Sequence, residues 1–321
     1  MRFSVVITTY QRLEWLRRAI DSALNQTIDC QVVVVDDCSQ DGTDEYMRNL
    51  CTQMQQRGES RLVYHRNSVN RGHAASVNVG VEVSSGDWIK FLDDDDYLAP
   101  DCLEKMSDAI ARHPDAVICS CVAAQVDPME TEISRTPVFG PGRAFYVPQV
   151  DIHYAMLLEL LPFGTPVQVA CRRDAFLSTG GWDSSLDTNC DDIDSWIRIA
   201  QFGDAIFINE CLAFRTIWTG ALNAKFSLQD RLDTNILMKK KIYQLVDGIH
   251  RPRMPSFDAV RLYLRLHWLM VAIKNRNLSY VLEIVDLSLL SLTAWRLLIT
   301  AAIARRCRLH HNSIRKLVLI E

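Results

Sequence analysis

The sequence predicts an α/β fold in which helices flank a mostly parallel β-sheet, with a helical region after it. Two observations lead to this fold class. In the first hundred residues, short apolar runs rich in Val and Ile alternate with segments that have apolar residues at helical spacing. From about residue 226 onward, only helical spacing remains. We therefore expect a sheet-containing region over 1–225, with halves at 1–100 and 101–225, and a helical region over 226–321.

Four apolar runs in the first half predict strands, because strands buried on both faces of a sheet are short, continuous and β-branched. They cover 3–9, 31–35, 61–65 and 88–92. Segments with helical spacing follow the first three, at 13–24, 44–54 and 74–83. This alternation predicts parallel pairing of the strands.

The second half continues the same plan less regularly. Helical spacing predicts helices at 102–113 and from 172 to Gly180-Gly181. Apolar runs predict strands at 116–123, 167–171, 204–208 and 212–215. Between them, 127–151 is rich in Pro, Gly and polar residues and predicts a long loop. Loops of this length inside compact domains are usually functional or mobile.

Composition excludes some classes of function. The 321 residues are 48% hydrophobic and 23% charged, as in a globular protein. The net charge of −4 argues against a nucleic-acid-binding protein, which usually has a basic excess. The ten cysteines are scattered, and the chain opens on a strand-like run without the features of a secretory signal. We expect reduced cysteines and a cytoplasmic protein.

Polar clusters follow three of the predicted strands at their carboxyl ends. They are Thr8-Thr9-Tyr10, Asp36-Asp37 and the run Asp93-Asp94-Asp95-Asp96. In open α/β sheets, ligands bind in the crevice beyond the carboxyl ends of the strands. We therefore expect the three clusters to converge on one crevice.

The run of four acids is the strongest chemical signal in the chain. Like charges this close repel one another and raise each other's pKa values unless a cation lies nearby. In an extended segment Asp93 and Asp95 point the same way, and paired carboxylates are typical ligands of Mg²⁺. The alternative is a solvated acidic turn before the next helix, with Asp96 or Asp101 as its N-cap.

Five motifs, in this order, give the chain a resemblance to a known family. They are V-V-I-T-T-Y at 5–10, V-V-D-D-C-S-x-D-G-T at 34–43, N-R-G at 70–72, S-G-D-W-I at 85–89 and F-L-D-D-D-D-Y-L at 91–98. Together they resemble the inverting nucleotide-sugar glycosyltransferases of family 2, of the bacterial polysaccharide or O-antigen type. The resemblance implies the GT-A fold, with a Rossmann-like sheet. It makes 1–100 the nucleotide-binding half and 101–225 the acceptor half of a catalytic domain, with 127–151 in the acceptor wall.

The resemblance implies roles for the matching residues of the donor site. Thr8 and Tyr10 hold the base of the nucleotide, and Asp37 accepts a hydrogen bond from the uracil ring or the ribose. Tyr10 has an alternative as an interior aromatic residue with a bonded hydroxyl. Asp37 has an alternative as a turn or cap residue before Gly42. In the acidic run, Asp93 and Asp95 hold Mg²⁺ or Mn²⁺, and Asp94 approaches the ribose or the sugar.

Two departures from the family pattern concern the diphosphate and the metal. Val77 stands where members often carry an arginine, in the sequence A-R-N. Three basic residues are candidates to take its place: Arg12, Arg66 and Arg71. Arg215 is followed by Thr216-Ile217-Trp218 where many relatives have R-x-H, so we expect no histidine ligand from this segment.

A second acidic segment, C-D-D-I-D-S-W-I-R at 190–198, resembles the family's E-D-x-D-x-W-x-R segment. The second acid of that segment is the general base of the family, which falls here on Asp192. An acceptor hydroxyl loses a proton as it attacks, so a carboxylate must lie within hydrogen-bond reach. We expect the backbone at the helix start and a neighbour such as Arg198, on the next helical turn, to orient it. The alternative is a set of charges that favour a helix N-terminus, namely Asp191, Asp192 and Asp194.

The C-terminal third predicts a membrane contact. An apolar stretch at 278–304 is interrupted by charged residues, so it offers no run long enough to span a bilayer. The chain then becomes basic over 305–316. An apolar helix followed by a basic cluster suits the surface of an anionic membrane, where a lipid-linked acceptor would be presented on the cytoplasmic side. The alternative is a helical pair that packs on the catalytic domain or on a second subunit as a homo-oligomer.

The predicted function is transfer of one hexose or N-acetylhexosamine from a nucleoside-diphosphate sugar, preferably UDP-linked, to a saccharide hydroxyl in cell-surface polysaccharide synthesis. One alternative is a nucleotidyltransferase, which would usually carry a Gly-rich phosphate loop that Thr9-Tyr10-Gln11-Arg12 lacks. The other is a non-catalytic, nucleotide-sugar-binding subunit of a polysaccharide complex. No nucleic-acid partner is expected.

Overall fold

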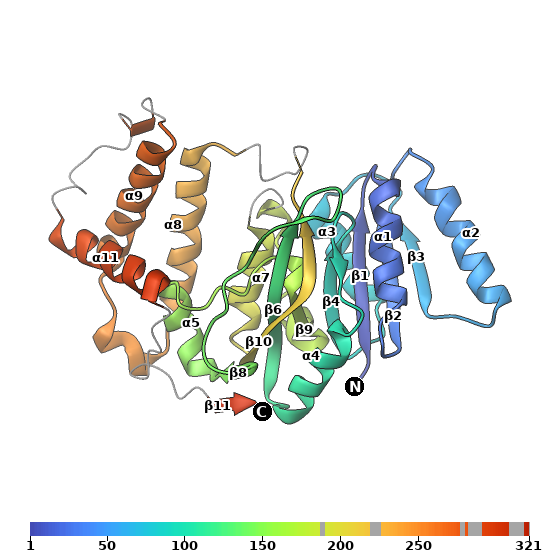
Figure 1. Ribbon diagram of the computed structural model, residues 1–321, viewed down its shortest axis with the longest axis horizontal. Coiled ribbons are helices and arrows are strands. Elements are labelled where there is room, and N and C mark those ends of the chain that lie inside the picture. The colour runs from blue at the N-terminus through green and yellow to red at the C-terminus, as the bar shows by residue number, and fades with distance from the viewer. Residues whose placement is uncertain (187–189, 219–225, 277–279, 282–290, 308–317, 321) are drawn as a thin grey trace. The chain divides into compact units, whose positions relative to one another are not determined.

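The computed structural model describes the chain except for residues 187–189, 219–225, 277–279, 282–290, 308–317 and 321, and except for side chains from residue 300 onward. The chain divides into two compact units (Figure 1). Unit 1 comprises Met1–Val147, Phe163–Thr219 and Leu317–Glu321, and unit 2 comprises Pro148–Pro162 and Gly220–Lys316. Unit 2 therefore includes a segment from the middle of the chain.

Unit 1 is built on one sheet. Its strands are β1 Phe3–Thr9, β2 Cys30–Asp36, β3 Leu62–Arg66, β4 Trp88–Asp93, β5 Tyr97–Leu98, β6 Ala116–Val126, β7 Glu132–Arg135, β8 Ala144–Val147, β9 Val169–Arg172, β10 Asp204–Thr216 and β11 Val318–Ile320. The order across the sheet is β11-β8-β10-β6-β9-β4-β1-β2-β3, with β5 beside β10 and β7 beside β6. Its helices are α1 Leu13–Leu24, α2 Thr43–Gln56, α3 His73–Val83, α4 Cys102–Arg112, α6 Arg173–Ser178 and α7 Asp191–Ile199, with 3₁₀ turns η1 Pro166–Gln168 and η2 Ser184–Leu186.

Strands β1 to β4 pair in parallel, as predicted, and helices cover both faces of this part of the sheet. In Figure 1, α1 lies in front of these strands and α3 behind them. The apolar stripe of α1 is fully buried at Leu16 and Ile20. On the opposite face, a Cβ atom at Gly80 of α3 would lie 2.4 Å from Val6, so glycine permits the close approach of this helix.

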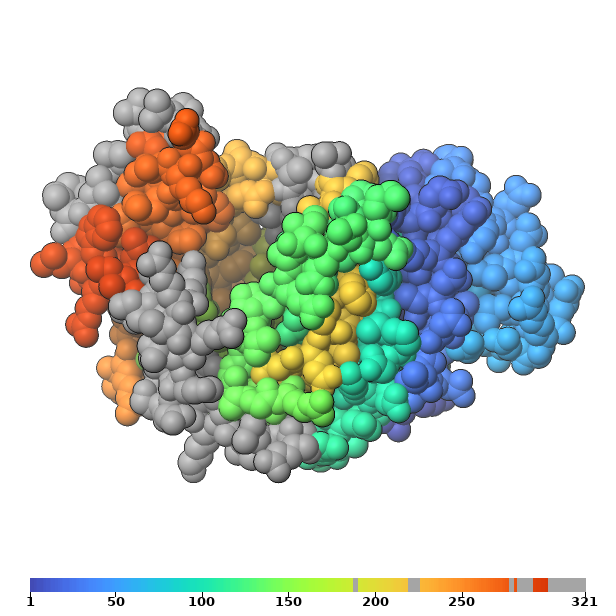
Figure 2. Space-filling model, in the orientation of Figure 1, coloured from blue at the N-terminus to red at the C-terminus, as the bar shows by residue number. Residues whose placement is uncertain are grey.

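The second half of unit 1 differs from the prediction in three ways. Strand β9 pairs antiparallel with β4 and with β6, so the sheet is mostly but not entirely parallel. The runs predicted as two strands form the single strand β10, which has irregular register between Ile208 and Ala213. The predicted loop at 127–151 contains β7 and β8, which pair with β6 and β10. Figure 2 shows this light green segment crossing the surface beside the yellow β10.

A buried lysine connects the antiparallel part of the sheet to β4. Lys90 is fully buried, and its ammonium group donates to the backbone carbonyls of Phe91 and Val169 at 3.3 and 3.4 Å and to that of Val167. Burial lowers the pKa of Lys90. Several carbonyl acceptors compensate a charge that would otherwise be costly inside a protein.

Unit 2 is helical in its described residues. Its elements are α5 Gln149–Leu157, α8 Leu228–Leu245, the 3₁₀ helix η4 Gly248–Arg253, α9 Phe257–Lys274 and α11 Leu292–Cys307. Leu232 of α8 packs with Leu264 and Leu266 of α9 in the core of this unit. Lys239 of α8 donates at 2.7 and 2.8 Å to the carbonyls of Met156 and Leu157, which lie at the C-terminal end of α5.

The membrane prediction concerns mainly the end of the chain. Among the helices that the structure describes, none combines the length and the apolar character needed to traverse a bilayer. The predicted apolar stretch at 278–304 lies partly outside the described residues, and the side chains of the basic stretch at 305–316 lie outside them entirely.

Candidate active site

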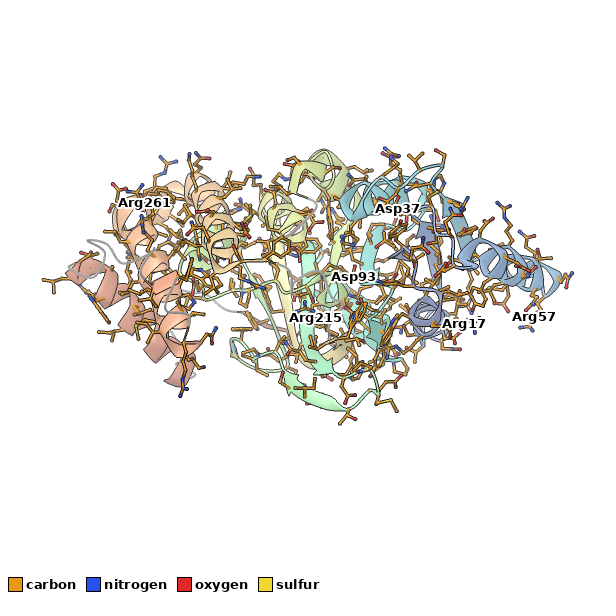
Figure 3. All side chains as sticks on the ribbon, turned by 90° about the horizontal axis from the view of Figure 1, so that it is seen from above. Arg17, Asp37, Arg57, Asp93, Arg215 and Arg261 are labelled. Atoms are coloured by element: carbon orange, nitrogen blue, oxygen red, sulfur yellow. The ribbon has the colours of Figure 1, made fainter. Side chains whose placement is uncertain are left out.

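The polar clusters of the first half meet at one edge of the sheet. The register of the parallel strands places Thr9 of β1 beside Asp36 of β2, and Thr8 beside Asp93 of β4. Seen from above, Asp93 lies between Asp37 and Arg215 (Figure 3). The prediction that the three clusters converge is therefore confirmed.

The acidic run forms a turn at the end of β4. Asp93 is the last residue of the strand, Asp94 and Asp95 lie in the turn, and the amide of Asp96 donates to the carbonyl of Asp93 at 3.1 Å. The expectation of an extended segment is wrong at this point. Asp93, Asp95 and Asp96 nevertheless each offer a carboxylate oxygen, and these oxygens lie within 4.8 Å of one another. The spacing predicted two metal ligands, Asp93 and Asp95, and the structure adds Asp96 as a third candidate.

Each acid after Asp93 has polar partners. Asp94 is buried and accepts hydrogen bonds from the Thr9 hydroxyl at 2.8 Å and from the Arg12 guanidinium at 3.0 Å. The same Arg12 nitrogen lies 3.5 Å from Asp95 Oδ2. Asp96 accepts from the backbone amide of Thr216 at 2.8 Å. Asp94 thus belongs to an internal hydrogen-bond network rather than to the group of three converging oxygens.

Burial raises the pKa values of the three acids that follow Asp93. Loss of solvent raises the pKa of Asp94 to about 7, although the Arg12 charge acts in the opposite direction. Loss of solvent and neighbouring acids raise the pKa of Asp95, and raise that of Asp96 well above its usual range. Carboxylate oxygens that converge without enough positive charge suit a hard divalent cation such as Mg²⁺ or Mn²⁺. The three carboxylates of Asp93, Asp95 and Asp96 therefore suit the predicted Mg²⁺ or Mn²⁺.

His73 joins the acidic turn to the second acidic segment. It is the first residue of α3, and its Nε2 lies 3.1 Å from Asp93 Oδ1. Its Nδ1 lies 3.3 Å from Asp191 Oδ2. Loss of solvent opposes the charge of His73, but the hydrogen bonds to Asp191 and Asp93 raise its pKa well above the usual value. For Asp93, loss of solvent is outweighed by the His73 hydrogen bond, which lowers its pKa.

Sequence reasoning gave His73 no role. Its only local signal is its position directly after the N-R-G motif at 70–72, at the start of a helix. The bond to Asp191 spans 118 residues of sequence, so no spacing rule within one element would have found it.

Asp37 organises the N-R-G motif. Its carboxylate accepts from the Asn67 side chain and from the backbone amides of Arg71 and Gly72, each at 2.8 Å. The backbone of Gly72 has a φ of 88°, which glycine adopts without strain. Asp37 is 4% exposed, and this network fixes the approach of the chain to α3. A turn or cap role before Gly42, the predicted alternative, does not describe these contacts.

The two residues predicted to hold the nucleotide base lie at the end of β1. Tyr10 is 46% exposed, so it is not the interior aromatic residue of the alternative. Thr8 is buried and lies beside Asp93 in the register of β1 and β4. Their donor-binding roles stay predictions.

Asp192 lies in the first turn of α7 and is partly buried. Loss of solvent and the charge of Asp191 raise the pKa of Asp192 to about 7. The expectation that Arg198 orients Asp192 is wrong, because Arg198 pairs with Asp194 at 2.8 Å. The reason is helical geometry: Arg198 is four residues after Asp194 but six after Asp192. The expected backbone contact is present, because Asp192 Oδ1 accepts from the backbone amide of Ile193 at 2.7 Å.

The candidate arginines for the diphosphate have different surroundings. Arg66 pairs with Asp36 at 3.3 Å, and Arg12 is held by Asp94. Arg71 has an exposed side chain. Arg215 of β10 was not among the predicted candidates, yet its charge acts on Asp93 and lowers its pKa. The arginine of the incomplete R-x-H pattern was the sequence feature that could have pointed to Arg215.

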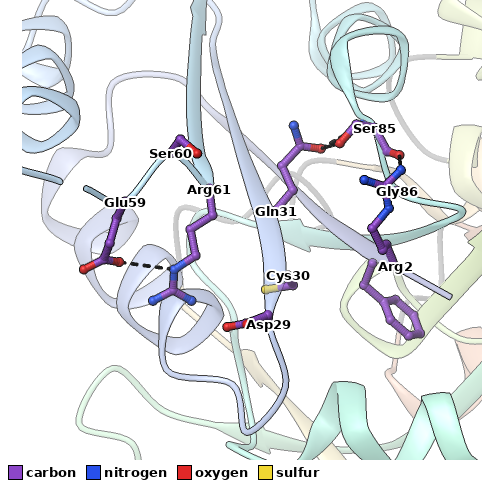
Figure 4. Close-up of a pocket in the computed structure, with 10 residues that line it drawn as sticks. Arg2, Asp29, Cys30, Gln31, Glu59, Ser60, Arg61, Ser85 and Gly86 are labelled. Carbon is purple, nitrogen blue, oxygen red and sulfur yellow. Dashed lines mark hydrogen bonds and ion pairs between the residues drawn. The ribbon is translucent and has the colours of Figure 1, made fainter. Parts of the chain in front are cut away.

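A separate pocket lies at the amino ends of the parallel strands (Figure 4). It has a volume of about 690 Å³ and is lined by Arg2, Phe3, Asp29, Cys30, Gln31, Glu59, Ser60, Arg61, Ser85 and Gly86. Arg61 pairs with Glu59 at 3.3 Å, and Gln31 accepts from the amide of Ser85 at 2.8 Å. Because parallel strands have their carboxyl ends at the other edge, this pocket lies away from the acids.

Comparison with known proteins identifies the family. The model of glycosyl transferase family 2 matches residues 4–179, more than half of the chain. The chain belongs to this family. A glucosyl-dolichyl phosphate glucuronosyltransferase of Haloferax volcanii is 27% identical over 248 residues, which cover 68% of this chain and 75% of that protein. A GalNAc(5)-diNAcBac-PP-undecaprenol beta-1,3-glucosyltransferase of Campylobacter jejuni is 34% identical over 107 residues, 33% of each chain.

Solved structures confirm the predicted GT-A fold for this glycosyltransferase. TarS 1–349 of S. aureus, in complex with UDP-GlcNAc, has a TM-score of 0.60 and 16% identity, and the match covers 84% of this chain and 81% of that one. The mannosyltransferase PcManGT of Pyrobaculum calidifontis, in complex with GDP-Man and Mn²⁺, has a TM-score of 0.59 and 19% identity, with 94% and 86% covered. At these identities the likeness concerns the fold alone.

The family match covers only part of the candidate site. Residues 4–179 include Asp37, Asp93 and Asp95 but end before Asp192. The family membership favours glycosyl transfer over the nucleotidyltransferase alternative. The evidence for the role of Asp192 therefore lies in the contacts of α7.

Proposed function

We propose that this glycosyltransferase moves one hexose or N-acetylhexosamine from a nucleoside-diphosphate sugar, preferably UDP-linked, to a hydroxyl of a saccharide acceptor, with inversion. One observation carries the proposal. His73 lies between an acid that ends β4 and an acid that begins α7, at 3.1 and 3.3 Å. Asp93, on the donor side, and the helix that carries Asp192, the acid suited to acceptor activation, are thereby held close together. The relatives solved with UDP-GlcNAc and with GDP-Man support a nucleotide-sugar donor.

The nucleotide of the donor would lie along the carboxyl ends of β1 and β2. The exposed ring of Tyr10 offers a stacking face for the base, and Thr8 offers a hydroxyl. The Asp37 carboxylate already accepts three hydrogen bonds, and its two oxygens have about four acceptor sites. One further bond, from the uracil ring or the ribose, is therefore available. Asp94 would lie near the ribose or the sugar.

Arg71 and Arg215 are the arginines we propose for the diphosphate. Arg12 and Arg66 are engaged with acids of the protein itself, at 3.0 and 3.3 Å. Arg71 has an exposed side chain and directly precedes Gly72, the N-cap of α3, and a helix N-terminus favours anions. Arg215 is close enough to Asp93 to lower its pKa.

Asp93 and Asp95, together with Asp96, would hold Mg²⁺ or Mn²⁺ through their converging oxygens. The bound cation would supply Lewis-acid stabilisation of the charge on the leaving diphosphate. The convergence of these three carboxylates supports a metal site. The structural neighbour solved with Mn²⁺ supports it as well.

Asp192 would act as the general base. As the acceptor oxygen forms its bond with the anomeric carbon, the bond from that carbon to the diphosphate oxygen breaks, and the hydroxyl proton passes to Asp192. Displacement from the opposite face inverts the centre, so an α-linked donor gives a β-linkage. A base with a pKa of about 7 suits this role, since about half of it is ionised at neutral pH and it still binds a proton well.

We propose residues 1–225 as the catalytic domain and 226–321 as a region that contacts the cytoplasmic face of a membrane, where a lipid-linked acceptor is presented. The described part of unit 2 supports this with exposed apolar side chains on α9 and α11. They are Met270, Ile273, Leu292 and Ile299. Cosedimentation with anionic vesicles tests the proposal, and a salt-insensitive homo-oligomer without vesicle binding would support the alternative.

A donor screen tests the function. UDP-, GDP- and dTDP-sugars are added with and without Mn²⁺, and the melting temperature reports binding, because a ligand of the native state raises apparent stability. The donor that stabilises most is then incubated with saccharide acceptors. NMR of the product gives the anomeric configuration, for which we expect inversion. Donor binding without transfer to any acceptor, and without donor hydrolysis, would support the non-catalytic subunit instead.

A further inference from the structure

His73 holds two acids from distant parts of the chain. Its imidazole is a rigid ring with nitrogens on two sides, and the oxygens of Asp93 and Asp191 lie at 3.1 and 3.3 Å from them. Asp93 ends a strand of the nucleotide-binding half, and Asp191 begins α7 in the acceptor half. A single side chain thus defines the separation between the two halves at the site.

Helix α3 is fixed on the side of the nucleotide-binding half. Asp37, at the end of β2, accepts from the amides of Arg71 and Gly72 immediately before His73. The helix is also packed closely on β1, where a Cβ atom at Gly80 would approach Val6 to 2.4 Å. His73 is therefore presented from a rigid support.

The same helix holds the segment that leads to α7. Asn78 accepts from the amide of Trp182 at 2.7 Å and donates to its carbonyl at 2.9 Å, a reciprocal pair. Gly181 has a φ of +81°, and a Cβ atom there would lie 2.5 Å from the Asn78 side chain. The ring of Trp182 meets the His73 ring edge-on at 5.4 Å. Two residues of α3, one turn and a half apart, therefore contact both ends of the segment that precedes Asp192.

We infer that His73 is a positioning residue that sets Asp191, and with it the neighbouring Asp192, at a fixed place relative to the acids of β4. The inference rests on the proposed function, in which Asp192 is the base for the acceptor. The physical reason is geometric: in-line displacement requires the base and the leaving group on opposite faces of one carbon. A misplacement of about 1 Å can reduce the rate about 100-fold.

The experiment compares His73→Ala and His73→Gln with the parent enzyme. For His73→Ala we expect kcat for transfer to fall about 100-fold, the loss typical of a misplaced catalytic group. The affinity for UDP at saturating Mn²⁺, measured by calorimetry, should stay unchanged. His73→Gln keeps a donor that reaches one acid and should recover part of kcat. In the Asp192→Asn background, His73→Ala should have no further effect on transfer.

Hydrogen exchange provides a readout that does not depend on activity. Peptides that cover α7 should exchange faster in His73→Ala, while those of β1 and β2 stay unchanged. His113→Ala is the matched control, because His113 also bonds an aspartate, Asp204, at 2.8 Å, and stacks on Tyr146. It should lower stability without changing either kcat or the exchange of α7.

Two results would overturn the inference. One is a UDP affinity that falls as much as kcat, because His73 would then contact the donor. The other is unchanged exchange of α7 together with unchanged kcat. If no donor is transferred by the parent enzyme, the proposed function fails, and the exchange of α7 still decides whether His73 holds this helix.

Discussion

The indole N–H of Trp218 donates to Oδ2 of Asp95 at 2.8 Å. Asp95 is the acid that the family resemblance assigns to the metal, and the guanidinium of Arg12 lies 3.5 Å from the same oxygen. Arg12 also lies over the Trp218 ring, 5.2 Å from its centroid. Protein donors therefore already engage one of the carboxylates proposed to hold the cation.

Trp218→Phe should increase the affinity for Mn²⁺ in the absence of nucleotide. The variant keeps an aromatic ring but removes the competing N–H donor. A hydrogen bond to a charged group contributes about 1.5 kcal/mol or more, so we expect an increase of about tenfold. Calorimetric titration with Mn²⁺ measures it. Trp15→Phe, the same change in an indole 5.9 Å away, should leave the affinity unchanged. A weaker affinity in Trp218→Phe would mean that the indole supports the metal site.

Asp95→Ala should lose both transfer and the Mn²⁺-dependent part of nucleotide binding. The substitution removes one of the three carboxylates whose oxygens lie within 4.8 Å, and hard divalent cations depend on such oxygens. Thermal shift with UDP, with and without Mn²⁺, is the measurement. Metal-dependent stabilisation equal to that of the parent enzyme would exclude Asp95 as a ligand.

Asp192→Asn should lose transfer while it retains Mn²⁺-dependent UDP binding. The amide cannot take the proton of the acceptor hydroxyl, and the loss of a general base reduces rates about 10²- to 10⁴-fold. Asp258→Asn is the control, because Asp258 also lies in the first turn of a helix, α9, and is exposed. It should transfer sugar at the parent rate. Transfer by Asp192→Asn at the parent rate would show that the base is another residue.

The pH dependence of transfer follows from the pKa of Asp192, which loss of solvent and Asp191 raise to about 7. The base acts in its ionised form, so protonation below this pH removes activity. We expect kcat/KM to reach a plateau above pH 7 and to fall about tenfold per unit well below it. Initial rates between pH 5.5 and 8.5 at saturating metal measure the profile. A flat profile across this range would contradict the assignment.

Asp96→Asn should stabilise the protein in EDTA, more at pH 8 than at pH 5. Loss of solvent and the nearby acids raise the pKa of Asp96 well above its value in the unfolded chain. Ionisation therefore costs stability that grows as pH rises. Asparagine removes this cost and retains an oxygen for the amide of Thr216. Melting temperatures at the two pH values test it, with Asp101→Asn, whose carboxylate pairs with Lys105 at 2.8 Å, as control. A lower melting temperature for Asp96→Asn at pH 8 would contradict the prediction.

Much of the first half was predictable from the sequence alone. Strands β1, β2, β3 and β4 begin and end within one residue of their predicted bounds, because a buried parallel strand is a local run of apolar, β-branched residues. The acids at the carboxyl ends were predictable for the same reason, since parallel strands end at one edge. The family motifs added the fold and the class of reaction.

Tertiary structure alone decided the contacts among these residues. His73 reaches Asp191 across 118 residues, and Trp218 reaches Asp95 across 123. The antiparallel insertion of β9 between β4 and β6 likewise depends on the order of strands in the sheet. Local sequence determines which segments become strands and helices, whereas the packing of those segments determines which side chains share hydrogen bonds, because such partners lie far apart along the chain.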